Sequence, residues 1–272
     1  MKISSFHVRE AGMKQVPVVV SIPHCGIYVP ESIRETFASG QVRNLPTTDW
    51  YLHHLCDFLP AMGITTLYGT YSRLVADIDT PGDASLVPRQ LPDGSPVYSE
   101  PLTAQDIQAR RDLVYAPYHA RLNELLQSRI TRFGSVVLLD LHSFPSREAA
   151  AYSFPAQVYV GDDAGRANPG WLTGAVQHAF SHVGLDVARN SALRSRYIVP
   201  HYGSQPRVSA LYTSLRWDLY LDEQHPDRTP AHAGFRAFRN VLSDVFSSIV
   251  AEINAGSLRM NRERRLGLRL TV

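Results

Sequence analysis

Two uninterrupted apolar runs, each ending in a polar cluster, constrain the fold most strongly. Residues 16–22 read VPVVVSI, and residues 135–140 read SVVLLD. Runs of this length without polar alternation are typical of strands that are covered on both faces, as in the sheets of α/β proteins. The sequence therefore predicts two central strands.

Amphipathic segments with helical spacing alternate with these runs. Helices are predicted over residues 48–59, 103–133, 169–182 and 230–254. Further strands are predicted over residues 65–68, 74–78, 156–160 and 208–212. Helices that alternate with apolar strands indicate an α/β fold, here a single mixed sheet with helices on both faces.

Composition narrows the class of protein. The 272 residues contain no internal repeat or Ser/Gly-rich linker, so we expect one catalytic domain over 1–272. A net charge of +2, spread along the chain except at its C-terminal end, argues against a nucleic-acid partner. The apolar run near the N-terminus is too short for a signal peptide or a membrane anchor. Two cysteines make no disulfide framework, so a cytoplasmic protein is expected.

Two histidines follow the central apolar runs. His24 comes after the first run and His142 after the second. The carboxyl ends of neighbouring strands meet at one crevice in such a sheet, and two histidines with one carboxylate are a usual catalytic zinc set. Either histidine alone would more often be a hydrogen-bonded polar residue, but two at matching positions favour a metal site. Asp49 and Asp140 are the nearest candidate acids in the sequence.

Short motifs in a fixed order resemble those of the N-formylglutamate amidohydrolases. They cover residues 17–225 and read SIPHCG (21–26), TD (48–49), SRLVAD (72–77), DASL (83–86), PYH (117–119), DLHS (140–143), HYG (201–203) and LYLDE (219–223). The resemblance implies a carboxypeptidase-like α/β fold. It also implies a zinc-dependent enzyme that cleaves an amide, such as the formyl amide of N-formylglutamate.

The resemblance implies roles for five residues. His24 and His142 would bind Zn²⁺, with Asp49 as the third ligand. Asp140 would orient His142 from outside the ligand set, as metal-bound histidines commonly require. Arg73 would stabilise the negative charge that develops on the carbonyl oxygen when water attacks an amide.

Departures from the family pattern concern the substrate and the base. Asp79 and Thr80 stand where the family has an Asn-Arg pair that would bind a substrate carboxylate, so we expect a preference for less acidic N-acyl compounds. Tyr202 is a further candidate for substrate binding. Ser214 occupies the position of the family's general-base Glu, and serine is a poor proton acceptor at neutral pH. Asp218, four residues on, is the candidate replacement.

Two other functions remain open from the sequence. The protein could be a non-catalytic relative that retains the fold and binds a small molecule or metal. A thiol hydrolase that uses Cys25 would need a separate base, since His24 is adjacent in the chain and points elsewhere.

Overall fold

A mixed sheet organises the protein. The structure, a computed structural model, describes residues 3–12, 14–150, 155–191, 195–228 and 233–265. Within these ranges the strands are β1 (Phe6–Arg9), β2 (Val18–Ile22), β3 (Thr65–Gly69), β4 (Val136–Phe144), β5 (Val158–Gly161), β6 (Val187–Arg189) and β7 (Val208–Arg216). They form one sheet in the order β1-β3-β2-β4-β7-β5-β6, in which β1 and β5 run antiparallel to their neighbours β3 and β7. The predicted mixed sheet is confirmed.

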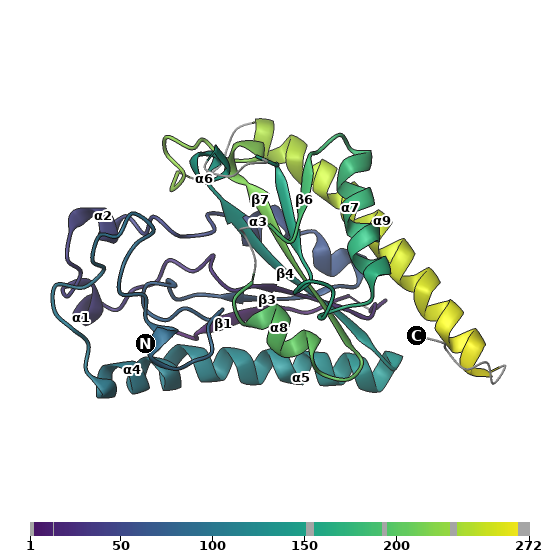
Figure 1. Ribbon diagram of the computed structural model, residues 1–272, viewed down its shortest axis with the longest axis horizontal. Helices are drawn as coiled ribbons and strands as arrows, with labels where there is room; N and C mark the ends of the chain where they lie inside the picture. Colours follow the sequence, from purple (N-terminus) through teal and green to yellow (C-terminus); the bar gives the residue numbers. More distant parts are fainter. Residues whose placement is uncertain (1–2, 13, 151–154, 192–194, 229–232, 266–272) are drawn as a thin grey trace.

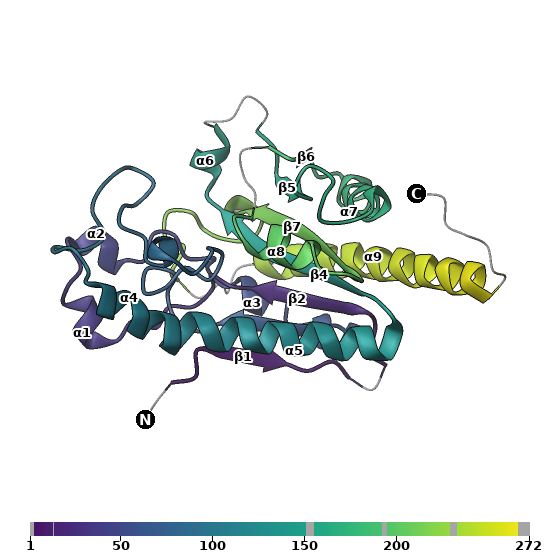
Figure 2. The same ribbon diagram turned by 60° about the horizontal axis from the view of Figure 1, so that its bottom comes forward.

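Helices cover both faces of this sheet. The α-helices are α1 (Glu31–Arg34), α2 (Gly40–Arg43), α3 (Leu52–Leu55), α4 (Ala104–Arg110), α5 (Ala116–Phe133), α6 (Ser146–Ala150), α7 (Gly170–His182), α8 (Ile198–Gly203) and α9 (Ala233–Arg265). Figures 1 and 2 show α5 and α8 against one face, and α7 with the long α9 against the other. Short turns of helix, η1 (Leu59–Met62), η2 (Ala84–Leu86) and η4 (Trp217–Leu219), lie in the connections.

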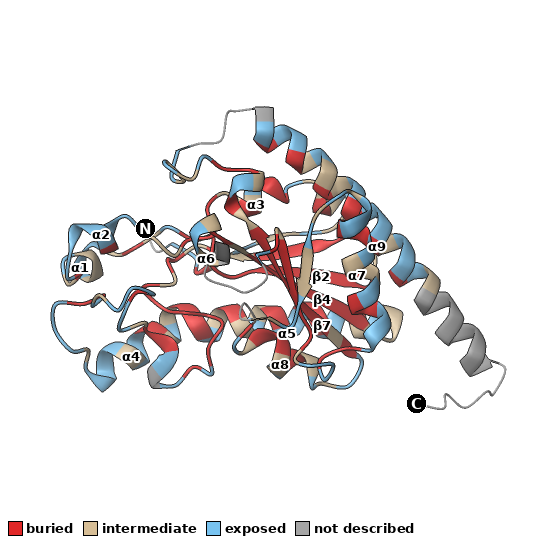
Figure 3. Ribbon diagram, turned by 45° about the horizontal axis from the view of Figure 1, so that its top comes forward, coloured by how far each residue is buried: buried red, intermediate tan, exposed pale blue. Residues whose placement is uncertain are grey.

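The central strands are buried because both of their faces are covered. All five residues of β2 are buried, and β4 is buried except at Ser143. Figure 3 shows these strands and β7 as the buried centre of the molecule, with exposed residues on the outer sides of the helices. β2 and β4 are parallel neighbours, with Ser21 opposite Asp140. Their carboxyl ends therefore lie side by side, which brings His24 and His142 to one place.

The predicted helix over 103–133 is a composite. α4 leads into a π-helical turn, η3 (Arg111–Tyr115), and α5 follows. Pro117 occupies the first turn of α5, where its missing N–H removes no bond that the α-helix needs. The π turn and the proline thus divide the segment without breaking it.

Two element predictions are wrong. Residues 74–78 form a turn rather than a strand, because Ser72 O accepts a hydrogen bond from Val75 N at 2.9 Å and folds the chain back. Residues 48–59 contain only the short α3, because Tyr51 adopts the left-handed conformation, with φ 54°, and prevents a helix from starting at Asp49. In both segments most of the apolar residues are buried in the core although the predicted element does not form.

No helix within the described residues is both long enough and apolar enough to span a membrane.

A partly buried histidine links α5 to α8 and to the turn near residue 78. His119 Nε2 lies 3.0 Å from Ile78 O, and its Nδ1 lies 2.9 Å from the Tyr202 hydroxyl. Because Ile78 O can only accept, Nε2 carries the proton and Nδ1 accepts from Tyr202. Burial lowers the pKa of His119 from 6.5 to about 4.

Acid should destabilise the protein through His119. The unfolded chain binds this proton below pH 6.5 and the folded protein only below about 4, so stability is full above pH 6.5 and falls as the pH drops towards 4. Between pH 7 and 5 the expected contribution is roughly 2 kcal/mol. Urea unfolding should show a smaller loss between these pH values in His119→Gln, while the exposed control His182→Gln should behave like the unmodified protein. Equal losses in both variants would contradict this assignment.

Candidate metal centre

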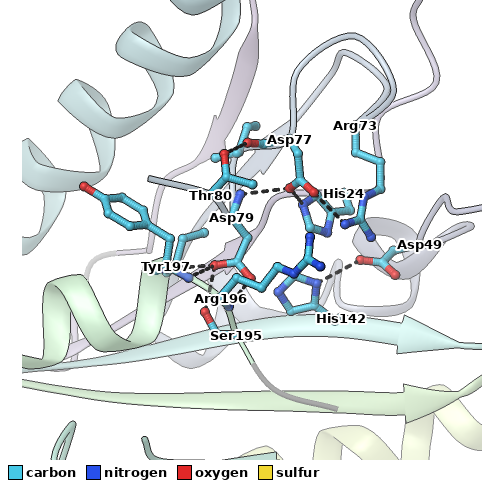
Figure 4. A network of polar contacts seen from close by, with 12 residues as sticks. His24, Asp49, Arg73, Asp77, Asp79, Thr80, His142, Ser195, Arg196 and Tyr197 are labelled. Atoms are coloured by element: carbon cyan, nitrogen blue, oxygen red, sulfur yellow. Dashed lines mark hydrogen bonds and ion pairs between the residues drawn. The ribbon is translucent and has the colours of Figure 1, made fainter. Parts of the chain in front are cut away.

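Three buried side chains converge at the carboxyl ends of β2 and β4. His24, Asp49 and His142 each offer a ligand atom, and the three atoms lie within 4.8 Å of one another. The two imidazole rings are 4.9 Å apart between centroids, and His142 Nδ1 lies 3.4 Å from Asp49 Oδ2 (Figure 4). The structure thus brings together the three residues predicted as ligands.

The backbone fixes this arrangement. Asp49 N donates to His24 O at 2.9 Å, which ties the segment before α3 to the end of β2. After His24 the chain passes so close to residues 70–71 that a Cβ on Gly26 would lie 2.4 Å from Tyr71 O. Only glycine permits this approach. Asp49 Oδ1 accepts from the backbone N (2.9 Å) and the hydroxyl (3.0 Å) of Ser143, so Asp49 is also tied to β4.

A carboxylate braces each histidine on the side away from the cluster. His24 Nε2 lies 2.7 Å from Asp77 Oδ1, and His142 Nε2 lies 3.0 Å from Asp140 Oδ2. Asp140 also accepts from Ser21 Oγ at 2.9 Å. A carboxylate on one ring nitrogen fixes the ring and directs the other nitrogen, with its lone pair, towards a metal.

The atoms that face the cluster are poorly satisfied. Among the described residues, the buried His24 Nδ1 has no hydrogen-bond partner, and the buried Asp49 Oδ2 has only the long contact of 3.4 Å with His142 Nδ1. Buried polar atoms in folded proteins are nearly always paired, so two such atoms directed at one point indicate a missing partner. Two imidazole nitrogens and one carboxylate oxygen fit a divalent metal ion with an open position.

A second group of acids overlaps the first. Asp79, Asp140 and His142 also place one potential ligand atom each within 4.8 Å of one another. However, Asp79 already accepts four hydrogen bonds, and Asp140 already holds His142 Nε2 and Ser21 Oγ. The acids of this second group therefore have fewer free lone pairs, and the His24–Asp49–His142 group fits a metal better.

Neighbouring charges keep Asp49 and His142 ionised although both side chains are buried. Desolvation would raise the pKa of Asp49, but hydrogen bonding and charge from His142 lower it overall. Desolvation would lower the pKa of His142, but Asp140 and then Asp49 raise it well above its usual value. In the metal-free protein these groups therefore stabilise one another as ions. A bound cation would take the place of the proton on His142.

Arg73 lies at the edge of the centre and holds Asp77. Its Nη2 donates to Asp77 Oδ2 at 2.6 Å, while the side chain remains 26% exposed. Asp77 therefore links Arg73 to His24. The role of Asp77 in bracing His24 was not predicted. Its only signal in the sequence is its place as the acid that ends the SRLVAD motif.

Other predicted site residues lie in different surroundings. Tyr202 is buried on α8, with its hydroxyl bonded to His119. Thr80 is buried and its hydroxyl donates to Asp77 O at 2.8 Å. Asp218 is 43% exposed and forms a bidentate pair with Arg216, with N–O distances of 2.7 and 2.9 Å. The structure does not gather Asp218 with the two histidines and their acids.

Ser214 lies opposite His142 in the pairing of β4 with β7, and it is fully buried. Another carboxylate, Glu148 on α6 just beyond the end of β4, was missed from the sequence. Burial raises its pKa, the charges of Arg147 and Arg73 lower it, and that of Asp49 raises it again. The side chain is partly buried and has no hydrogen bond or ion pair among the described residues.

Cys25 does not have the surroundings of a nucleophile. It is 4% exposed, and burial, followed by the charge of Asp49, raises the pKa of its thiol well above the usual value. Reactive cysteines are partly exposed and electropositive. The environment of Cys25 therefore disfavours thiolate chemistry.

The fold and the centre together define a class: an α/β protein with a buried His-Asp-His group suited to a metal ion at the carboxyl ends of two parallel strands. Comparison with known proteins is more specific. The family model for N-formylglutamate amidohydrolase matches residues 16–221. The chain belongs to that family.

Similar proteins cover nearly the whole chain. An N-formylglutamate deformylase from Pseudomonas aeruginosa is 28% identical over 269 residues, with 92% of this chain and 96% of the relative covered. Another, from Pseudomonas putida, is 27% identical, with 83% and 87% covered. The crystal structure of an N-formylglutamate amidohydrolase from Ralstonia eutropha has the same fold, with a TM-score of 0.84 at 24% identity over 93% of this chain and 100% of that one.

Proposed function

We propose that the protein is a zinc-dependent amidohydrolase that cleaves the amide bond of a small N-formyl or N-acyl amino acid. The observation that carries the proposal is the buried group of His24, Asp49 and His142, in which each histidine is braced by a carboxylate. Family membership supports the reaction class, and the two deformylases named above act on N-formylglutamate. The two cysteines are free, which is consistent with a cytoplasmic location.

His24, Asp49 and His142 would hold the metal, and Asp77 and Asp140 would fix the orientation of the two imidazole rings. A bound zinc ion lowers the pKa of its water to about 7 and polarises the substrate carbonyl. Arg73 donates to Asp77 through Nη2 and keeps part of its side chain exposed at the edge of the centre. Its remaining N–H groups are suited to stabilise the negative charge on the carbonyl oxygen.

Proton transfer needs a carboxylate, because Ser214 cannot serve. Glu148 is our candidate in place of Asp218. Asp218 is neutralised by Arg216, whereas Glu148 is partly buried, unpaired among the described residues and within electrostatic reach of Arg73 and Asp49. A carboxylate with a raised pKa is a better base at neutral pH than an ordinary one. Glu148 would accept the proton of the attacking water and return it to the leaving amine.

Metal removal tests the proposal. We expect the purified protein to contain about one zinc ion per chain, to hydrolyse N-formyl amino acids, to lose that activity on dialysis against a chelator and to regain it with added zinc. Circular dichroism before and after dialysis checks that the fold survives. Full activity in metal-free protein would overturn the metal dependence.

A non-catalytic relative is the alternative that Ser214 favours. A protein that binds one zinc ion but hydrolyses none of a panel of N-formyl, N-acetyl and N-succinyl amino acids would support this alternative over catalysis.

A further inference from the structure

Asp79 anchors the loop that leads into α8. Its carboxylate is 4% exposed and accepts four hydrogen bonds, from Ser195 Oγ (2.8 Å) and from the backbone N atoms of Arg196 (2.8 Å), Tyr197 (2.9 Å) and Ile198 (2.7 Å). The expected preference for less acidic compounds took Asp79 as a free carboxylate beside the substrate. Here the carboxylate is buried and its oxygens are already occupied by four donors, so it does not face a ligand as a free acid.

The anchored loop holds Arg196 at the metal centre. An oxygen of Asp79 lies within 4.8 Å of a ring nitrogen of His142, and the backbone of Arg196 is bonded to that carboxylate. In Figure 4 the Arg196 side chain extends from this anchor towards His24 and His142. The side chain is exposed, and its guanidinium has no hydrogen bond or ion pair within the described part of the chain.

We propose that Arg196 binds a carboxylate of the substrate and so determines specificity for acidic N-acyl amino acids. This inference rests on the proposed function. Guanidinium groups bind carboxylates through two parallel hydrogen bonds, which fix orientation as well as charge. The residue at position 80, where the family has arginine, is a buried threonine whose hydroxyl is already bonded. Arg196 thus supplies from the α8 loop the cation that position 80 lacks, and Asp79 is the residue that positions it.

The expected specificity therefore differs from that predicted from the sequence. The absence of arginine at position 80 led us to expect neutral substrates. The Arg196 guanidinium, 116 residues further along the chain, supplies a positive charge instead. Arg73 does not compete for this role, because Asp77 already occupies its Nη2 and it lies on the His24 side of the centre.

The test compares three substrates that differ by one charge. They are N-formyl-L-glutamate, N-formyl-L-glutamine, which lacks the side-chain carboxylate, and the α-amide of N-formyl-L-glutamate, which lacks the other. In Arg196→Ala we expect kcat/KM to fall about 10- to 100-fold for N-formylglutamate and for one amide, mainly through KM. The amide that lacks the bound carboxylate should change less than about threefold. Arg196→Lys should lose less, since it keeps the charge but not the bidentate geometry.

Arg236→Ala is the matched control, because Arg236 is exposed on α9 and the charge change is the same. It should leave all three substrates unaffected. Equal losses on all three substrates in Arg196→Ala, or no loss on any, would overturn the proposal.

Calorimetric binding of the same compounds to metal-free protein separates this inference from the proposed function. If the unmodified protein turns over none of them, the proposed function fails, and weaker binding of N-formylglutamate by Arg196→Ala than by Arg236→Ala still supports the carboxylate site. If the unmodified protein binds none of them, or if both variants bind as it does, the inference about Arg196 is wrong.

Discussion

His24→Ala and His142→Ala should each lose bound metal and nearly all activity. The proposed site has three protein ligands, and a zinc ion held by two of them loses the tetrahedral arrangement that protein ligands impose. We expect metal affinity to fall by more than the 10- to 100-fold typical of changes to outer residues, and kcat/KM to fall by about 10³-fold or more. Metal content after gel filtration and steady-state kinetics measure the two effects.

The histidine variants need a control for folding, because each removes the histidine partner of a buried carboxylate, Asp77 or Asp140. Conservative His24→Gln and His142→Gln variants retain a side chain that can hydrogen-bond to these acids. His182→Ala, at the exposed end of α7, controls for the loss of a histidine. Stoichiometric metal in a folded His24 or His142 variant would remove that residue from the ligand set.

The acids that brace the histidines should have smaller effects than the ligands. Asp77 and Asp140 contact the far nitrogens of the two rings and do not face the cluster. Replacing either by Asn retains an acceptor oxygen but removes the charge. The difference between ligand and bracing variants follows from the geometry, since only His24 Nδ1, Asp49 Oδ2 and His142 Nδ1 are directed inwards.

The local sequence pattern was sufficient to predict the strands and helices at the centre of the fold. The apolar runs at β2 and β4, and the amphipathic segment at α7, specify their structure through their own residues. β1 was missed because its sequence, FHVR, is short and half polar, and it is a strand only because it pairs with β3. α8 was missed because its sequence, IVPHYG, contains both Pro and Gly, and its first N–H group, that of Ile198, donates to Asp79 from a distant segment.

The site could be predicted as far as its motifs reach. His24, Asp140 and His142 come from motifs at strand ends and Asp49 from the motif before α3, and the structure gathers them. The contacts of Asp77 with His24 and of Asp79 with the α8 loop join residues 53 and more than 115 positions apart. Such pairs depend on how the chain returns across the sheet. A single sequence carries no local signal for them.

Replacing the proposed base, Glu148, should lower turnover without removing the metal. Glu148→Gln should lower kcat by about 10²- to 10⁴-fold while leaving metal content unchanged, because the amide keeps the size of the side chain but cannot accept a proton. Glu252→Gln, exposed on α9, makes the same charge change away from the centre and should have no effect. An equal loss of bound metal in Glu148→Gln would instead make Glu148 a part of the metal site.

The pH profile distinguishes a base from a residue that only supports the fold. The carboxylate form is the active one, and burial raises the pKa of Glu148 above its usual 4.5, with Asp49 adding to the rise and Arg147 and Arg73 opposing it. Activity of the unmodified protein should therefore fall as the pH drops through this raised pKa, and the acid limb should be absent from the residual activity of Glu148→Gln. Asp218→Asn should retain both activity and acid limb, since Asp218 is paired with Arg216. If Asp218→Asn is inactive and Glu148→Gln is not, Asp218 is the base and the Arg216 pair must open in the enzyme–substrate complex.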